Sequence, residues 1–299
     1  MFPGGAVSAD IGLTREFAQT AEDLGYAYVA TADHVVGADP AYHPELAGFP
    51  YDHETPTAEP FVLLSFIAGC TRRLGLLTNV VILPQRQTVL AAKQAAELDR
   101  LSEGRLVLGV GVGWNTAEYG AMGMPFSRRT TTLERQILLL RSLWTQPSVT
   151  VTDGQHELDH VAISPRPSRP VPIVIGGMGP LALSLIGRLA DGWTVRQYLS
   201  WDVEEFEADM LERRAVIAAA AREAGRDPAS IRLILRTGGP RLEDQVAMAK
   251  RWEALGATHC SLVTQEESAG DTTGAGPTPR QLLDALQAFR DAFGPLAGD

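Results

Sequence analysis

The chain has 299 residues, of which 45% are hydrophobic and 21% are charged, and it carries only 2 cysteines. These proportions are typical of an ordinary globular protein and exclude a disordered, fibrous or disulfide-scaffolded chain. The 26 basic and 36 acidic residues give a formal charge of -10, which argues against binding to duplex nucleic acid or to an anionic membrane. We therefore expect a protein that acts on a small-molecule substrate.

The N-terminal sequence Met-Phe-Pro-Gly-Gly-Ala has no basic segment followed by an apolar one, and no run in the chain approaches about 18 uninterrupted apolar residues. Cys70 and Cys260 lie far apart without a C-x-x-C spacing, which predicts two buried thiols in a reducing compartment. The chain is therefore expected to be cytoplasmic, with no export signal and no membrane span.

Short apolar runs alternate with amphipathic stretches along the chain. The runs predict strands at 27–32, 74–82, 105–112, 172–176, 191–195, 230–236 and 258–264. The stretches between them predict helices at 13–24, 59–70, 88–101, 128–145, 179–190, 202–224, 241–254 and 278–293. Strict alternation implies parallel strands joined by right-handed crossovers. We predict one α/β domain over residues 1–299, a (β/α)8 TIM barrel that is one strand short.

Three segments depart from this alternation. The missing first strand should precede the helix at 13–24, where only residues 1–3 are available, so it is either truncated to a stub or the chain begins later than its relatives do. In the segment 149–158, residues of period two flank an Asp-Gly turn, which predicts a β-hairpin inserted before the fifth strand. The long loops 36–58 and 265–277 are typical of lids or of disordered segments.

The sequence His156-Glu157-Leu158-Asp159-His160 matches the zinc-protease pattern H-E-x-x-H. That pattern binds a metal because a helix places residues i and i+4 on one face. The preceding turn predicts a strand instead, in which residues four apart are separated by about 13 Å at roughly 3.3 Å per residue. The two histidines could then not bind one ion, and we predict no metal site.

The segment 177–182, Gly-Met-Gly-Pro-Leu-Ala, fits G-x-G-x-x-A and follows the predicted strand 172–176. A dinucleotide-binding fold would place this motif early, with an acidic residue about twenty positions later. Here four βα units come first and Asp191 follows too soon. Backbone N–H groups at a glycine-rich helix start still suit a phosphate, and the alternative is a tight turn that binds nothing.

Glycines alternate at Gly109, Gly111 and Gly113, so they face one side of the predicted strand 105–112. Small residues there either relieve crowding inside the barrel or let a flat ligand lie against the backbone. Trp114 and Asn115 follow at the carboxyl end, which is the active-site face of a barrel.

Asp33 and His34 close the strand 27–32 at the same face, and a carboxylate beside a histidine is a plausible pair for proton transfer. Adjacent residues point to opposite sides, so we assign His34 to the mouth and Asp33 to a supporting role. Arg196 and Arg236 end later strands and are candidate cations for an acidic ligand, while Trp193 is expected to pack in the core. The loop 237–240, Thr-Gly-Gly-Pro, is a competing anion site.

Taken together, several segments resemble the bacterial luciferase-like flavin and deazaflavin oxidoreductases, and most closely their actinobacterial branch that depends on coenzyme F420. The resemblance is carried by 31–35 (Thr-Ala-Asp-His-Val), 83–86 (Leu-Pro-Gln-Arg), 91–105 (Ala-Ala-Lys-Gln-Ala-Ala-Glu-Leu-Asp-Arg-Leu-Ser-Glu-Gly-Arg), 109–115 (Gly-Val-Gly-Val-Gly-Trp-Asn), 175–177 (Ile-Gly-Gly) and 190–193 (Ala-Asp-Gly-Trp). These segments span about residues 20 to 195 and are specific in combination.

The resemblance implies a (β/α)8 barrel that holds a tricyclic ring at its carboxyl mouth, with a non-prolyl cis peptide at Asn79-Val80. It places the cofactor phosphate on main-chain N–H groups near Gly113 and at the turn 177–179. The cofactor-binding residues expected on this basis are Asp33, His34, Asn79, Val80, Gly111, Gly113, Trp114, Gly176, Gly177, Met178 and Gly179.

One position departs from the family pattern. Deazaflavin sugar dehydrogenases of this family carry a catalytic Glu just after the fourth-strand glycines, where this chain has Trp114, so their chemistry should not be transferred. The polyglutamate tail of F420 would need local cations in an acidic protein, and the candidates are Arg86, Arg196 and Arg236.

We therefore expect a hydride transfer between C5 of F420 and an unidentified small organic substrate. His34 would donate or accept the proton, Asp33 would orient His34, and the loop 36–58 would act as a lid. The first alternative is an FMN-dependent monooxygenase supplied with reduced flavin by a partner reductase. A non-catalytic flavin-binding or deazaflavin-binding protein is the other, and the resemblance also suggests a homodimer.

Overall fold

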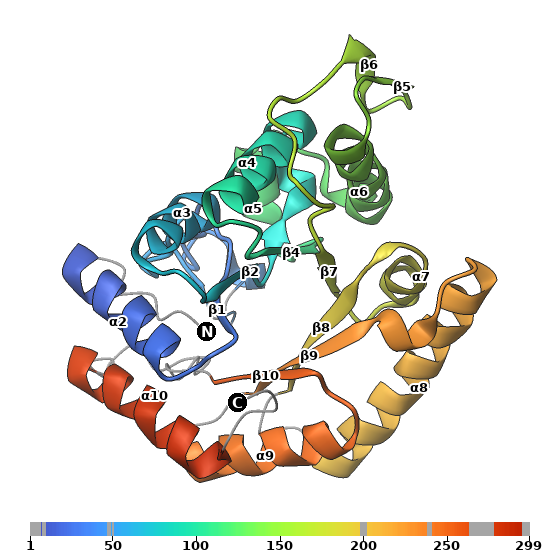
Figure 1. The fold of residues 1–299 in the computed structure, drawn as a ribbon. Coiled ribbons are helices and arrows are strands. Elements are labelled where there is room, and N and C mark those ends of the chain that lie inside the picture. Colours follow the sequence, from blue (N-terminus) through green and yellow to red (C-terminus); the bar gives the residue numbers. More distant parts are fainter. Residues whose placement is uncertain are drawn as a thin grey trace.

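The computed structural model describes residues 7, 10–46, 49, 51–197, 202–237, 241–262 and 278–294. Within them, parallel strands form one curved sheet in the spatial order β1-β2-β4-β7-β8-β9-β10, and the short β3 pairs with β4. The strands are β1 (Tyr28–Thr31), β2 (Gly75–Thr78), β3 (Val81–Ile82), β4 (Leu106–Gly111), β7 (Ile173–Gly176), β8 (Gly192–Gln197), β9 (Arg232–Thr237) and β10 (His259–Ser261). Figure 1 shows this sheet curling inside a ring of helices, which confirms the barrel-like α/β fold.

The helices of the ring follow the strands in chain order, as the sequence predicted. They are α2 (Ile11–Asp23), α3 (Pro60–Cys70), α4 (Thr88–Leu101), α6 (Arg129–Thr145), α7 (Pro180–Leu189), α8 (Val203–Glu223), α9 (Leu242–Ala254) and α10 (Pro279–Phe293). The sequence reading missed the short α5 (Thr116–Ala121) and joined β2 to β3 in one run. In the part of the chain described, no helix is both long and apolar enough to cross a membrane.

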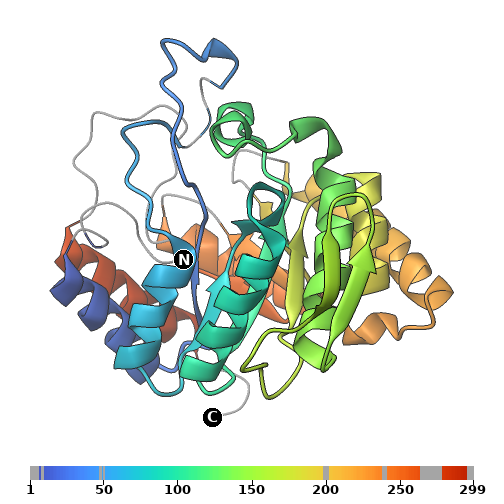
Figure 2. The same cartoon turned by 90° about the horizontal axis from the view of Figure 1, so that it is seen from above.

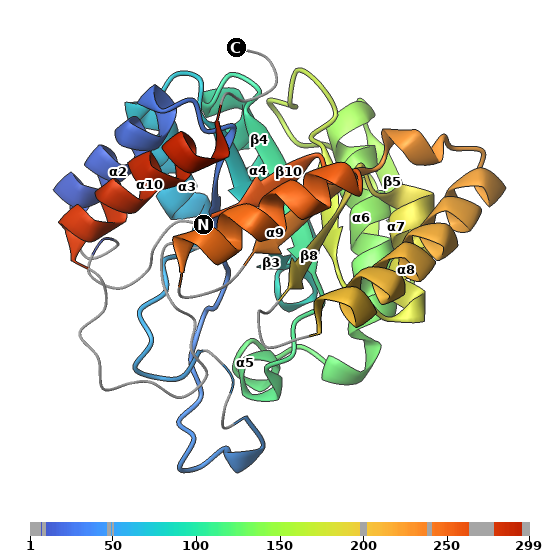
Figure 3. The same ribbon diagram turned by 90° about the horizontal axis from the view of Figure 1, so that it is seen from below.

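The ring of helices closes where α10 lies beside α2 (Figures 1 and 3). The hydroxyl of Tyr26 donates to the carbonyl of Leu286 at 2.8 Å, and Nε of Arg290 donates to the carbonyl of Leu24 at 3.0 Å. In the described residues, β1 pairs with β2 and β10 pairs with β9, so the sheet itself stays open between β1 and β10. The predicted stub at 1–3, the loop 265–277 and positions 238–240 of the Thr-Gly-Gly-Pro loop lie outside the described residues.

The predicted hairpin is confirmed as an antiparallel pair of β5 (Val149–Thr152) and β6 (Glu157–Val161). His156 and His160 therefore flank and occupy a strand rather than a helix, as expected. His156 contacts Thr88 and Asp153, at 2.7 and 3.1 Å, whereas the exposed His160 contacts its neighbour Asp159. The two histidines of the H-E-x-x-H match thus have different contact partners.

Apart from the half-buried β10, the strands of the sheet are largely buried on both faces, as is typical of parallel strands under a helical layer. Every residue of β2 and β4 is buried. Trp193 on β8 is 2% exposed, and its indole N–H donates to the carbonyl of Gly177 at 2.9 Å, so its expected packing role is confirmed. The two cysteines, in contrast, are half-buried rather than buried. Cys70 is the last residue of α3, and Cys260 lies on β10, the last strand of the open sheet.

The glycines of strand β4 make room for the neighbouring strand segment. A Cβ atom on Gly109 would lie 1.9 Å from the carbonyl oxygen of Thr78, and one on Gly111 would lie 2.7 Å from Cγ2 of Val80. Gly113 has a positive φ of 65°, which favours glycine. The packing explanation therefore holds for Gly109, while Gly111 admits the side chain of Val80 to the end of the barrel.

Replacing Gly109 by Ala is expected to destabilise the fold by about 1–3 kcal/mol, because the new methyl group meets a backbone carbonyl that the sheet holds in place. The matched control is Gly69→Ala on α3, where the added Cβ meets no atom within 4 Å. That control should stabilise the protein by roughly 0.5–1 kcal/mol through helix propensity. Urea denaturation of both variants measures these opposite changes in the free energy of unfolding. A Gly109→Ala variant as stable as wild type would contradict the prediction.

Candidate functional site

A cavity of about 360 Å³ lies at the carboxyl ends of the strands. Figure 2 shows α5 and the loop that follows β1 rising at one common end of the barrel. The cavity is lined by Ala32, Asp33, His34, Phe49, Tyr51, Asn79, Val80, Ile82, Gly111, Val112, Gly113, Trp114, Gly176, Arg196 and Arg236. The structure thus brings together most of the site residues expected from the sequence. Arg86 and the turn 177–179 are absent from the described lining.

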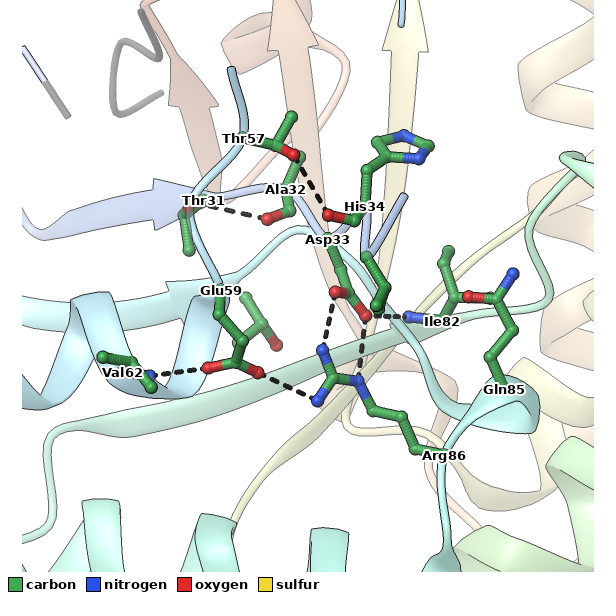
Figure 4. A network of polar contacts seen from close by, with 12 residues as sticks. Thr31, Ala32, Asp33, His34, Thr57, Glu59, Val62, Ile82, Gln85 and Arg86 are labelled. Atoms are coloured by element: carbon green, nitrogen blue, oxygen red, sulfur yellow. Dashed lines mark hydrogen bonds and ion pairs between the residues drawn. The ribbon is translucent and has the colours of Figure 1, made fainter. Parts of the chain in front are cut away.

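Asp33 is bound to Arg86 in a buried ion pair (Figure 4). Its Oδ1 accepts from Nη2 of Arg86 at 2.7 Å, and its Oδ2 accepts from Nε at 3.1 Å and from the backbone N–H of Ile82 at 2.9 Å. The other edge of the guanidinium donates to Glu59 at 2.9 Å. Burial would lower the pKa of Arg86, but the two carboxylates outweigh it and raise that pKa above its usual value.

Two sequence expectations are corrected by this ion pair. Arg86 is not available to an anionic cofactor tail, because both edges of its guanidinium face carboxylates and its side chain is only 12% exposed. Asp33 does not orient His34, because its two oxygens face Arg86 and Ile82. The expectation that Asp33 and His34 point to opposite sides is confirmed, since the imidazole and the carboxylate diverge in Figure 4.

The carboxylate that meets His34 comes from α5. Nδ1 of His34 lies 3.5 Å from Oε2 of Glu118, which is an ion-pair distance longer than a good hydrogen bond. Glu118 is 1% exposed, its Oε1 accepts from the backbone N–H of Val35 at 2.5 Å, and its Oε2 accepts from Gln85 at 3.2 Å. Burial raises the pKa of Glu118, but the contacts with His34, Gln85 and Val35 together outweigh it and lower that pKa.

Sequence reasoning missed Glu118, although a signal for it was present. Asn115 is the N-cap of α5, and its side chain accepts from the backbone N–H of Glu118 at 3.1 Å. The spacing Asn115-Thr116-Ala117-Glu118 is that of a capping box at a helix start. It could have predicted a short helix directly after the glycine strand, with an acid in its first turn.

Aromatic rings form one wall of the cavity. The ring of His34 lies 4.2 Å from that of Tyr51 and 5.6 Å from that of Trp114, and Phe49 stacks on Trp114 at 4.1 Å with 9° between the planes. Phe49 and Tyr51 belong to the loop 36–58, which is tied back to strand β1 where Thr57 donates to the carbonyl of His34 at 3.0 Å. This loop therefore supplies two of the rings of the wall.

The peptide between Asn79 and Val80 is cis, as the resemblance implied. The side-chain oxygen of Asn79 accepts from Thr194 at 3.0 Å. Its amide nitrogen is buried, and within the described ranges no acceptor lies within hydrogen-bond distance of it. Gly176 lies across from Val80, since a Cβ there would come within 3.2 Å of Cγ1 of Val80. The floor of the cavity thus combines an apolar ridge with one hydrogen-bond donor.

In the turn 177–179, the carbonyl groups of Gly177 and Met178 accept hydrogen bonds from side chains of the protein. Trp193 donates to the carbonyl of Gly177 and Arg213 donates to that of Met178. Gly179 is the N-cap of α7, with no side-chain cap hydrogen bond. The first backbone N–H groups of a helix have no partner within the helix, so this turn can present them to an anion.

Comparison with known proteins identifies related sequences and similar folds. A family model described as luciferase-like monooxygenase matches residues 3–238. An uncharacterised protein of Mycobacterium tuberculosis is 30% identical over 271 residues, which cover 88% of this chain and 92% of that protein. Pyrimidine monooxygenase of Allorhizobium ampelinum is 27% identical over 277 residues, covering 89% of this chain and 73% of the relative.

A second relative from Mycobacterium tuberculosis is an F420-dependent hydroxymycolic acid dehydrogenase, 29% identical over 217 residues that cover 72% of this chain and 55% of the relative. Among solved structures, an F420-dependent secondary alcohol dehydrogenase in complex with an F420-acetone adduct matches with a TM-score of 0.75. That match covers 94% of each chain at 16% identity, so the likeness is one of fold.

Replacing Arg86 by Met is expected to cost about 3–5 kcal/mol of folding free energy, because it leaves the buried carboxylate of Asp33 without its cation. Adding Asp33→Asn to Arg86→Met should recover part of this loss, since the uncompensated charge is then removed. Urea denaturation of the wild type, of Arg86→Met and Asp33→Asn alone, and of the double variant measures the coupling. Losses that simply add in the double variant would show that the two side chains do not act as a pair.

Proposed function

Since the chain belongs to the luciferase-like monooxygenase family, and its relatives include an F420-dependent dehydrogenase and a pyrimidine monooxygenase, we propose that it is an F420-dependent oxidoreductase. Its reaction would be a hydride transfer between the cofactor and a small organic substrate at the carboxyl mouth of the barrel. Family membership confirms the resemblance indicated by the sequence motifs. The preference for F420 rests on the F420-dependent relative and on the motif resemblance.

The observation that carries this proposal is the floor of the cavity. Val80 forms an apolar ridge between Gly111 and Gly176, beside the buried amide of Asn79 that still has a donor to offer. A flat heterocycle with a carbonyl acceptor fits these surroundings, because it would cover the ridge and accept the amide hydrogen bond. Asn79, Val80, Gly111, Gly113 and Gly176 are therefore the residues that would hold the cofactor ring.

Charged and backbone groups around the floor would hold the rest of the cofactor. The phosphate would meet backbone N–H groups near Gly113 and at the turn of Gly177, Met178 and Gly179. Arg196 and Arg236 line the cavity at the ends of β8 and β9 and would meet negative charge, a role in which arginine forms bidentate contacts. When bound, F420 supplies C5 as the hydride donor or acceptor.

The protein would orient the substrate, exclude water and manage the proton. His34 is the proton donor or acceptor in this proposal, because it lines the cavity and faces a buried carboxylate. Trp114 and the loop residues Phe49 and Tyr51 would cover the substrate side as a lid. Asp33 would act at a distance, by fixing the strand end that carries His34.

An FMN-dependent monooxygenase is the second candidate. It is favoured by the pyrimidine monooxygenase relative, whose match covers 89% of this chain. Such an enzyme would receive reduced flavin from a partner reductase. The third candidate is a protein that binds the cofactor without catalysing a reaction. For each of the three candidates, the family resemblance leads us to propose a homodimer.

A side-by-side titration of the purified protein with F420 and FMN, followed by absorbance and fluorescence, separates the first two candidates. F420 is expected to bind at least tenfold more tightly than FMN. Tighter binding of FMN would favour the monooxygenase, and binding of neither cofactor would overturn the proposal. Oxidation or reduction of the bound cofactor by a panel of alcohols and activated alkenes separates both enzymes from a binding protein.

Replacing His34 by Ala is expected to lower kcat by about 10²–10⁴-fold, since that is the usual contribution of a positioned acid or base. The affinity for F420 should remain within a few-fold of wild type. Turnover would be followed through the F420 absorbance, with any panel compound that the wild type converts. His156→Ala, in the hairpin away from the cavity, serves as the control, and unchanged turnover of His34→Ala would remove His34 from the mechanism.

A further inference from the structure

We propose that Glu118 is the positioning residue for His34, holding the imidazole at the cavity wall. This inference deepens the proposed function and rests on it, because it concerns the group that handles the proton. Glu118 was not among the site residues expected from the sequence or from the family resemblance. It is the geometry of α5 that brings this side chain beneath the imidazole.

Burial of both partners gives this contact its strength. The side chains of His34 and Glu118 are 9% and 1% exposed, and Nδ1 lies 3.5 Å from Oε2. Little water can screen a charge at such a site, so the interaction is stronger than between surface groups. In the described part of the chain, His34 is the one group able to carry a positive charge within ion-pair distance of Glu118.

Neutral donors fix the carboxylate in place. Its Oε1 accepts the backbone N–H of Val35, and Val36 offers a second, longer contact at 3.4 Å. Its Oε2 accepts from Gln85, and its own backbone N–H is held by the cap residue Asn115. These hydrogen bonds favour the ionised carboxylate without neutralising its charge. The negative charge therefore remains directed at the imidazole.

The neighbouring acid cannot take this role. Both carboxylate oxygens of Asp33 accept hydrogen bonds from Arg86 or Ile82. The two successive residues at the end of β1 thus have separate partners on opposite sides, a buried cation for Asp33 and a buried anion for His34. The same carboxylate of Glu118 also accepts from the backbone N–H groups of Val35 and Val36, where the loop 36–58 begins. Position of the imidazole and attachment of the loop are therefore linked through one side chain.

Other titratable groups near the imidazole are Tyr51 from the loop and Asp33 from its own strand end, while Trp114 is uncharged. Arg196 and Arg236 line the same cavity and act in the opposite sense to Glu118. Removing the charge of Glu118 would leave these cations in place. The protonated imidazole should then be less stable than in the wild type.

Histidine side-chain NMR of the ¹⁵N-labelled protein without cofactor tests this directly, with the His34 signal assigned from His34→Ala. In Glu118→Gln the midpoint of the His34 titration is expected to fall by about one pH unit or more, as removal of a close opposite charge usually causes. Glu59→Gln, which removes an acid paired with Arg86 instead, should leave the midpoint unchanged. Glu118→Asp keeps the charge at a longer distance and should give a smaller shift, and a midpoint that neither Glu118 variant moves overturns the proposal.

A double-mutant cycle on turnover separates positioning from loop attachment. Glu118→Gln should lower kcat in the wild type, with KM little changed, and have no further effect in His34→Ala. An equal factor in both backgrounds means that Glu118 acts only through the loop, which overturns the proposal. If His34→Ala itself leaves turnover unchanged, the proposed function of His34 fails, while the NMR titration still reports whether the pair exists.

Discussion

The buried ion pair between Asp33 and Arg86 is the constraint on which the mouth of the barrel depends. Asp33 follows the end of β1, and Arg86 lies in the segment that leads into α4. Asp33 also accepts the backbone N–H of Ile82 in β3, shortly after the cis peptide. Glu59 extends the network to the start of α3. The end of β1 and the starts of α3 and α4 are thereby fixed around one guanidinium, and none of them can move without uncovering a buried charge.

The geometry of the candidate site follows from that constraint. Because Asp33 is held on one side of the strand end, His34 must point to the other, where it lines the cavity and meets Glu118. Because Ile82 is held by Asp33, the preceding Val80 reaches over Gly111 and Gly176 to form the apolar floor. One ion pair thus fixes the backbone that carries both His34 and the surface proposed to receive the cofactor ring.

Sequence patterns predicted local features well and long-range partners poorly. Periodicity and turn residues are properties of neighbouring residues, so the strand–helix order, the hairpin and the opposite directions of Asp33 and His34 could be read from them. The partners of those two residues could not, since Arg86 is 53 positions from Asp33 and three strands, β2, β3 and β4, separate Glu118 from His34 along the chain. Proximity in sequence suggested that Asp33 orients His34, whereas the fold places a distant cation, Arg86, beside Asp33 and a distant carboxylate, Glu118, beside His34.

The central claim, that a tricyclic cofactor lies on the floor formed by Asn79, Val80, Gly111 and Gly176, is tested most directly by hydrogen–deuterium exchange with and without F420. Binding at this floor predicts slower exchange in the segments 33–38, 111–118 and 176–179, which border the cavity. Exchange in β10 should not change. Protection confined to the small apolar cavity of about 90 Å³ between β1 and β10, with none at the carboxyl mouth, would contradict the claim.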